Sequence, residues 1–130
     1  MTLKIQDMGQ AYYVDNSSDL EVILSKREGS GVNEFWLSHD NEKNPALSIV
    51  VNGDLASLTY FPEAHHPGFT SIGPLENLQS GELSIFYINT PTEKHLILND
   101  SIVPFSTAVD VAKEFFIKKN LPSSIEWLEL

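Results

Sequence analysis

The fold is decided by residues 46–60, which read ALSIVVNGDLASLTY. Two apolar runs, rich in the β-branched and aromatic residues of strands, flank the pair Asn52-Gly53. An Asn-Gly pair favours the positive backbone φ angles that a two-residue β-turn requires. The stretch therefore predicts an antiparallel β-hairpin, and this hairpin is the best-defined element of the chain.

Further strands and two helices are predicted around the hairpin. Alternating or continuous apolar runs predict strands at residues 11–15, 34–38, 83–88, 94–98 and 124–128. Apolar residues recur at helical spacing over about residues 18–28 and 106–119, which predicts a helix at each place. We expect an α+β fold, in which the two helices pack on a single antiparallel or mixed sheet of about six to seven strands. Residues 61–80 hold three of the seven prolines and are expected to contain no regular element.

Each predicted helix has a candidate N-terminal capping box. Ser17 or Ser18 can cap the first helix, with Glu21 supplying the returning carboxylate. Thr107 and Asp110 can do the same for the second helix. Pro122 lies beyond the expected end of the second helix and prevents its continuation.

Composition restricts the class of protein. The chain has 130 residues, of which 42% are hydrophobic. This length and composition suit a single domain, residues 1–130, with its own core. The chain has no cysteine, which excludes disulfide scaffolds, thiolate zinc sites and cysteine nucleophiles. No apolar run approaches the roughly 20 residues of a membrane helix, and the N-terminus has no apolar core of a secretory signal. We therefore expect a cytoplasmic protein that does not enter the membrane.

The charge is the unusual bulk property. Eighteen Asp and Glu against eight Lys and Arg give a formal net charge of −10. Phosphate binding depends on Lys and Arg, so nucleic acids and anionic lipids are not expected partners. A basic protein would be attracted to such a surface. Solubility alone also explains many acidic surfaces, so the charge by itself does not identify a function.

The order of three segments in the middle of the chain resembles the immunity protein 1 family of bacterial polymorphic toxin systems. These segments are residues 52–60, 68–73 and 86–87, and residues 103–127 are similar to the end of that family. The resemblance covers almost two thirds of the 130 residues. The turn at residues 88–93 departs from the family pattern, because it lacks the glycine expected there.

The resemblance implies a small cytoplasmic antidote without catalytic activity. It would bind the toxin domain that is encoded beside it, often a nucleic-acid deaminase, as in contact-dependent inhibition. A toxin that acts on nucleic acid needs a basic channel around its active site. An acidic antidote would be steered to that channel and would occlude it, and a monomer in a 1:1 complex is expected.

The long loop after the central hairpin supplies the candidate contacts with this partner. Aromatic and imidazole rings would anchor the toxin, while carboxylates would take the place of phosphates. The predicted partner-binding residues are Tyr60, Phe61, Glu63, His65, His66, Glu76 and Glu82. Asp40 and Glu42, in a second loop, could join them, whereas Tyr60 and Phe69 could instead lie in the core beneath the loop. Trp36 and Trp127 have apolar neighbours and are expected in the core.

Two other functions stay open at this point. Glu63, His65 and His66 could belong to a small metal-dependent hydrolase. Adjacent histidines are poor joint ligands, however, and a third ligand would have to come from His39 or His95. The second alternative is a general acidic adaptor or DNA mimic that binds several basic proteins. No catalytic residue, metal or cofactor is expected for the antidote.

Overall fold

The computed structural model describes residues 1–73 and 75–130. Ten strands are present in this part of the chain: β1 (Leu3–Gln6), β2 (Ala11–Val14), β3 (Val32–His39), β4 (Ala46–Asn52), β5 (Leu55–Phe61), β6 (Phe69–Ser71), β7 (Leu83–Tyr87), β8 (Lys94–Leu98), β9 (Ile102–Pro104) and β10 (Trp127–Glu129). The helices are α1 (Ser17–Leu24) and α2 (Phe105–Ile117), and a short 3-10 helix, η1 (Asn99–Ser101), precedes β9.

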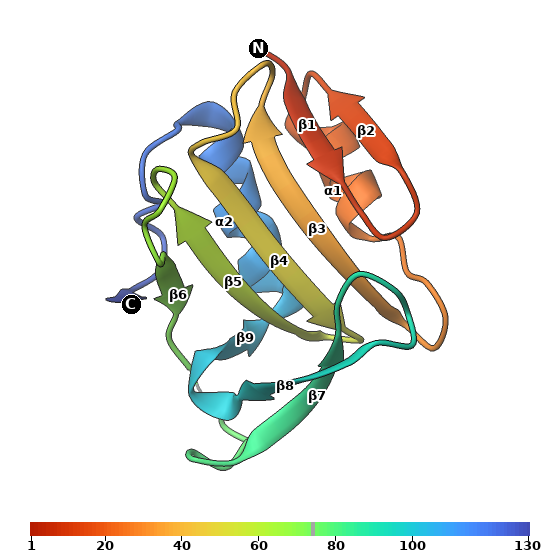
Figure 1. Ribbon diagram of the computed structural model, residues 1–130, viewed down its shortest axis with the longest axis vertical. Coiled ribbons are helices and arrows are strands. Elements are labelled where there is room, and N and C mark those ends of the chain that lie inside the picture. Colours follow the sequence, from red (N-terminus) through yellow and green to blue (C-terminus); the bar gives the residue numbers. More distant parts are fainter. Residues whose placement is uncertain (74) are drawn as a thin grey trace.

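Eight strands form one antiparallel sheet. Its order is β10-β6-β5-β4-β3-β1-β2, and β9 pairs with the beginning of β5 while β6 pairs with its end. The predicted hairpin is confirmed: Asn52 faces Leu55 across the β4–β5 turn, and Gly53 has a φ of 60°. Both helices lie against the same face of the sheet (Figure 1).

The α+β class and the two helices are confirmed, but the expected number of strands is wrong. The main sheet has eight strands, and β7 and β8 form a separate two-stranded sheet. The strands β1, β6 and β9 are additions to the prediction. Each has only three or four residues, and such short strands are held by their partners rather than by their own propensity. β6 lies inside residues 61–80, which were expected to be irregular.

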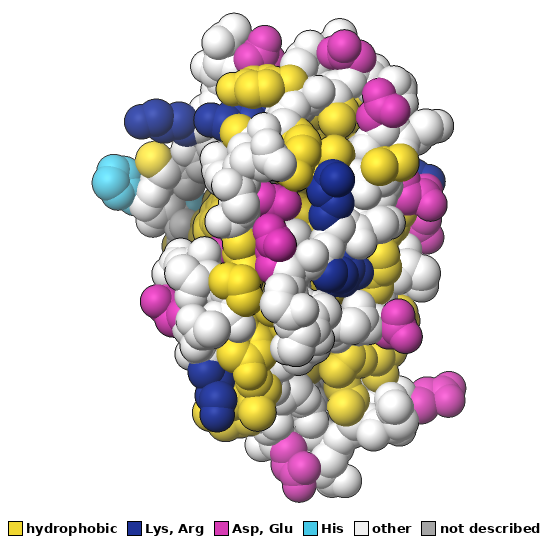
Figure 2. All heavy atoms as spheres, turned by 90° about the vertical axis from the view of Figure 1, so that its right-hand side faces the viewer, with side chains coloured by type: hydrophobic (Ala, Val, Ile, Leu, Met, Phe, Trp, Pro, Cys, Tyr) yellow, Lys and Arg dark blue, Asp and Glu magenta, His cyan; other side chains and the backbone are white. Residues whose placement is uncertain are grey.

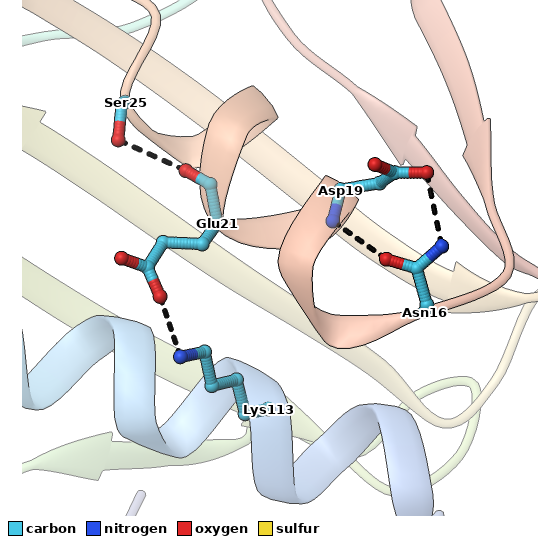
Figure 3. Close-up of polar contacts among 5 residues, drawn as sticks. All are labelled: Asn16, Asp19, Glu21, Ser25 and Lys113. Atoms are coloured by element: carbon cyan, nitrogen blue, oxygen red, sulfur yellow. Dashed lines mark hydrogen bonds and ion pairs between the residues drawn. The ribbon is translucent and has the colours of Figure 1, made fainter.

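The helices begin at caps other than the predicted ones. Asn16 is the cap of α1, because the backbone N–H of Asp19 donates to Asn16 Oδ1 at 2.8 Å (Figure 3). Glu21 instead turns outward to Lys113 of α2 and joins the two helices. α2 begins directly after Pro104 without a side-chain cap, so the box predicted with Thr107 is wrong.

Asn16→Ala is expected to lower the free energy of unfolding by about 1 kcal/mol, because it removes the acceptor for the first turn of α1. Ser18→Ala is the matched control, since Ser18 is exposed and was the competing candidate for the cap. Chemical denaturation of the two variants measures the difference. A larger loss for Ser18→Ala would show that the cap is assigned to the wrong residue.

The core lies between the sheet and the helices. Side chains at alternate positions of the central strands point toward α1 and α2, and Phe35, Leu47 and Leu58 are fully buried there. Phe115 of α2 is fully buried against them. A smaller apolar cluster of Val50, Phe86 and Ile102 lies apart from this core.

Trp36 lies outside the core, contrary to expectation, whereas Trp127 packs at its edge. Trp36 is 41% exposed, because strand alternation directs Phe35 and Leu37 into the core and Trp36 away from it. Trp127 is half-buried, packs against the core and donates its Nε1–H to the carbonyl of Pro122 at 2.7 Å. Trp36 is therefore available to a partner, whereas Trp127 contributes to the scaffold.

Glu114 of α2 holds the segment that leads to β10. Its carboxylate accepts from Ser123 Oγ at 2.9 Å and from the backbone N–H of Ser124 at 3.0 Å. Burial acts to raise the pKa of Glu114, but the hydrogen bonds from Ser123 and Ser124 together outweigh it, so the pKa lies below its ordinary value of 4.5. The charged carboxylate is thus the form that stabilises the folded chain.

Glu114→Gln is expected to destabilise the fold at neutral pH and to lose that effect in acid. A lowered pKa in the folded state gives stability that is present above about 4.5 and is lost as the pH falls through the folded pKa. Urea unfolding of wild type and variant at about pH 7 and about pH 3 measures this. Glu126→Gln, a change at an exposed carboxylate of the same segment, should show no such difference. An equal gap between wild type and Glu114→Gln at both pH values would contradict the assignment.

Candidate functional site

The face of the sheet opposite the helices carries the candidate site. Trp36, Ser48, Thr59 and Thr70 lie next to one another across β3, β4, β5 and β6, as the strand register shows. Small polar side chains thus form a floor beside one large exposed aromatic ring. We call this surface, with Phe61 at its border, the Trp36 face.

Two aromatic rings form the centre of the Trp36 face. The rings of Trp36 and Phe61 are stacked, with centroids 5.7 Å apart and planes 24° apart. Phe61 is half-buried and Trp36 is 41% exposed, so the pair presents a rigid apolar surface to solvent. Exposed Trp rings of this kind are frequent anchors of protein interfaces.

Shallow hollows lie on both sides of Trp36. One has a volume of about 310 Å³ and is lined by Trp36, Lys43, Asn44, Ala46, Phe61, Glu63, Ala64, His65 and His66. The other has about 460 Å³, and its lining includes Trp36, Tyr13 of β2 and the loop at residues 40–43. Both are open to solvent, which suits the side chains of a protein partner better than an enclosed small molecule.

His66 is fixed in place by three contacts. Its Nδ1 accepts from the backbone N–H of Gly68 at 2.8 Å, and its Nε2 lies 3.1 Å from Glu129 Oε2. The ring also stacks on Phe69, with centroids 5.2 Å apart. Because Nδ1 is an acceptor, Nε2 carries the proton and donates to Glu129. Both ring nitrogens of His66 are therefore occupied within the chain.

The hydrolase alternative gains no support from this geometry. Within residues 1–73 and 75–130, no group of three or more His, Asp or Glu residues could hold a metal ion. His39, one possible third ligand, is buried with its Nε2 3.2 Å from the carbonyl of Phe116. His95 lies on β8 in the separate sheet. Neither one reaches His65.

The structure brings together only part of the predicted binding set. Phe61, Glu63, His65 and His66 line one hollow of the Trp36 face. Tyr60 belongs to the core instead: it is 5% exposed, and its hydroxyl donates to the carbonyl of Lys119 at 2.7 Å. Burial raises the pKa of Tyr60, in keeping with a neutral structural role.

Glu76 and Glu82 line neither hollow of the Trp36 face. Both are exposed, and Glu82 directly precedes β7. Figure 1 shows the loop between β5 and β6 at one end of the sheet and the β7–β8 hairpin at the other. The carboxylates chosen from the long loop therefore do not form one cluster with Glu63.

The charges near the Trp36 face are mixed. Asp40, Glu42 and Glu63 are exposed beside Lys43. A hydrogen bond from Lys119 is the main cause that lowers the pKa of Glu42, so this carboxylate is paired within the chain. Figure 2 shows acidic side chains scattered among apolar and basic ones rather than gathered in one patch on the face that it displays.

Comparisons with known proteins bear on the chain as a whole. No family model matches the chain. Over 117 residues, which are 90% of this chain and 91% of the relative, the chain is 29% identical to a protein of Burkholderia cenocepacia (strain H111) named double-stranded DNA deaminase immunity protein. The expected resemblance to an immunity protein is confirmed. The matched length includes most of the sheet, so the similarity is not confined to one motif.

In the part of the chain that the structure describes, no helix has both the length and the apolar character to cross a membrane.

Proposed function

We propose that this chain is the immunity protein of a deaminase toxin, which it neutralises by binding and not by catalysis. The observation that carries the proposal is the 29% identity to a double-stranded DNA deaminase immunity protein over 90% of the chain. The negative charge of −10 supports it as well, because a toxin that acts on DNA needs a basic surface for its substrate.

The Trp36 face is the proposed contact with the toxin. Trp36 and Phe61 supply rigid aromatic area whose burial loses little side-chain entropy. Glu63 and Asp40, exposed at the edges of the two hollows, supply charges for Lys or Arg around the toxin's active site. His65 and His66 border the same surface. Seated in this way, the immunity protein keeps DNA out of the active site, and we propose a 1:1 complex.

The net charge acts on the association rate. Oppositely charged surfaces steer two proteins together and raise the rate constant above the unsteered value of about 10⁵–10⁶ M⁻¹s⁻¹. Salt screens this attraction beyond a Debye length of about 8 Å at physiological ionic strength. Association of the complex is therefore expected to slow as salt is raised, while dissociation changes less.

The test uses the deaminase domain that we expect to be encoded beside this chain's gene. The chain should abolish deamination of a DNA duplex at a 1:1 ratio and bind the domain with a dissociation constant of about 1 nM or lower. A different basic DNA-binding protein is the control, because an acidic adaptor or DNA mimic would bind it as well. A neighbouring deaminase that retains full activity at saturating concentrations of the chain would refute the proposal.

A further inference from the structure

The β7–β8 hairpin has an uncovered apolar outer face. Leu83 lies directly opposite Leu98, and Ile85 lies opposite Leu96, so the four side chains are neighbours on one side of the ribbon. Their exposed fractions are 57% for Leu83, 43% for Ile85, 51% for Leu96 and 47% for Leu98. We call these four residues the outer face of the hairpin.

The opposite side of the hairpin is already used for folding. Phe86 is fully buried in the small cluster with Val50 and Ile102, and Ile97 packs against that cluster. The hairpin is therefore apolar on both sides, although an antiparallel ribbon with one solvated side normally carries polar residues there. Folding accounts for the inner side alone. A contiguous exposed apolar surface on a soluble protein is typical of a binding site.

The segment that carries the outer face has a net negative charge. Residues 75–101 contain four carboxylates, Glu76, Glu82, Glu93 and Asp100, and one cation, Lys94, which gives a net charge of −3 with His95 neutral. Glu82 directly precedes Leu83, and Asp100 follows Leu98 by two residues, so acidic residues lie at the base of the hairpin. Lys94, opposite Tyr87, lies at the other end of the ribbon on the same side as the outer face. The Asp100 carboxylate accepts from Ser80 Oγ at 2.7 Å and from the Gly81 N–H at 2.8 Å, which fixes its position.

The hairpin also borders the Trp36 face. The backbone N–H of Asn89, in the turn between β7 and β8, donates to Glu34 Oε1 at 3.0 Å. Glu34 precedes Trp36 by two residues on β3 and therefore points to the same side of the sheet. A protein domain seated on the Trp36 face thus lies close to the turn of the hairpin.

We propose that the outer face of the β7–β8 hairpin is a second docking surface for the toxin domain, and that it receives an apolar protrusion flanked by Lys or Arg. The inference rests on the proposed function, because it takes the same basic partner. A second copy of this chain fits poorly, since it would bring together two segments that each have a net charge of −3, and like charges oppose such contact. A basic partner with an apolar protrusion matches both the apolar side chains and the net negative charge of the segment.

The double variant Ile85→Thr/Leu96→Thr tests the inference. Threonine keeps the β propensity of the strands and removes most of the apolar surface of one cross-strand pair. The dissociation constant for the neighbouring deaminase domain should rise by about 10- to 100-fold. Val22→Thr/Ile117→Thr is the matched control, because these residues are 61% and 63% exposed on the helices, on the other side of the sheet. That control should bind as wild type does.

Folding and self-association are measured on the same proteins. A thermal melt within a few degrees of wild type shows that the hairpin variant is folded. If the double variant does not fold, the single variant Leu98→Thr, at the end of β8, takes its place, and it too is expected to bind the toxin domain more weakly. Wild-type inhibition with unchanged affinity of the folded hairpin variant would overturn the inference and leave the proposed function intact. Loss of inhibition by the wild type itself would instead refute the proposed function. A wild-type dimer in sedimentation that Ile85→Thr/Leu96→Thr converts to monomer would assign the face to a second copy and overturn the inference.

Discussion

Trp36→Ala is expected to raise the dissociation constant for the toxin domain by about 100-fold while leaving the stability of the free chain nearly unchanged. Trp36 is 41% exposed and lies outside the core, so its truncation leaves the packing between sheet and helices intact. Buried at an interface, a Trp anchor contributes at least about 2 kcal/mol, and about 2.7 kcal/mol corresponds to 100-fold. Titration calorimetry with the deaminase domain measures the constant, and a thermal melt measures stability.

The conservative variant Trp36→Phe is the control for this experiment. It retains a ring that can stack on Phe61 and should lose less than tenfold in affinity. Equal affinity of Trp36→Ala and wild type would remove the Trp36 face from the proposed interface. A large drop in melting temperature for Trp36→Ala would show that the ring supports the fold instead.

Gly73→Ala is the second change with a large expected effect, and it acts on stability. A Cβ atom at this position would come within 2.2 Å of the backbone oxygen of Ile102 and 3.1 Å of that of Asn99. Neither neighbour is a flexible side chain, so the backbone itself must move. The N–H of Gly73 also donates to the carbonyl of Asp100, a bond that such a movement would strain. We expect a loss of about 3 kcal/mol in the free energy of unfolding.

Gly9→Ala separates this effect from a general cost of replacing glycine. Its Cβ would meet Glu28 Oε1 at 3.0 Å, which is the end of a flexible side chain that can rotate away. Urea denaturation of both variants should show a large loss for Gly73→Ala and a small one for Gly9→Ala. Equal stability of Gly73→Ala and wild type would contradict the close approach between the β6 exit and β9.

Local sequence patterns predicted the β4–β5 hairpin and the helix α2, because each of these elements is determined by residues that are close in sequence. The Asn52-Gly53 turn fixes the φ angles and the register of β4 and β5 without help from distant residues. Helical periodicity likewise placed α2 within two residues at each end. The short strands β6 and β9 are different, because both depend on pairing with β5 from separate parts of the chain. A strand of only three residues is too short to show a sequence pattern that would predict such pairing.

The candidate site was predictable only as far as its loop. Phe61, Glu63, His65 and His66 are close in sequence and stay close in the structure. Trp36 was placed in the core because its neighbours are apolar, yet alternation along β3 turns it outward. That alternation was the available signal. Nearness in sequence is the only reason to group Glu76 and Glu82 with Glu63. It does not determine the path of the chain after β6 ends at Ser71.

The way in which the chain leaves and rejoins the sheet has an evolutionary consequence. β6 and β9 pair with the same strand, and Ser71 Oγ donates to the carbonyl of Ser101 at 2.7 Å, so the excursion between them starts and finishes at one place. A segment closed at its base in this way can lengthen, shorten or change its outward residues while the scaffold keeps its register. As long as Phe86 stays buried in the inner cluster, the exposed residues between β6 and β9 can be replaced without disturbing the sheet. An antidote of this architecture can therefore change its contacts as the sequence of its target changes.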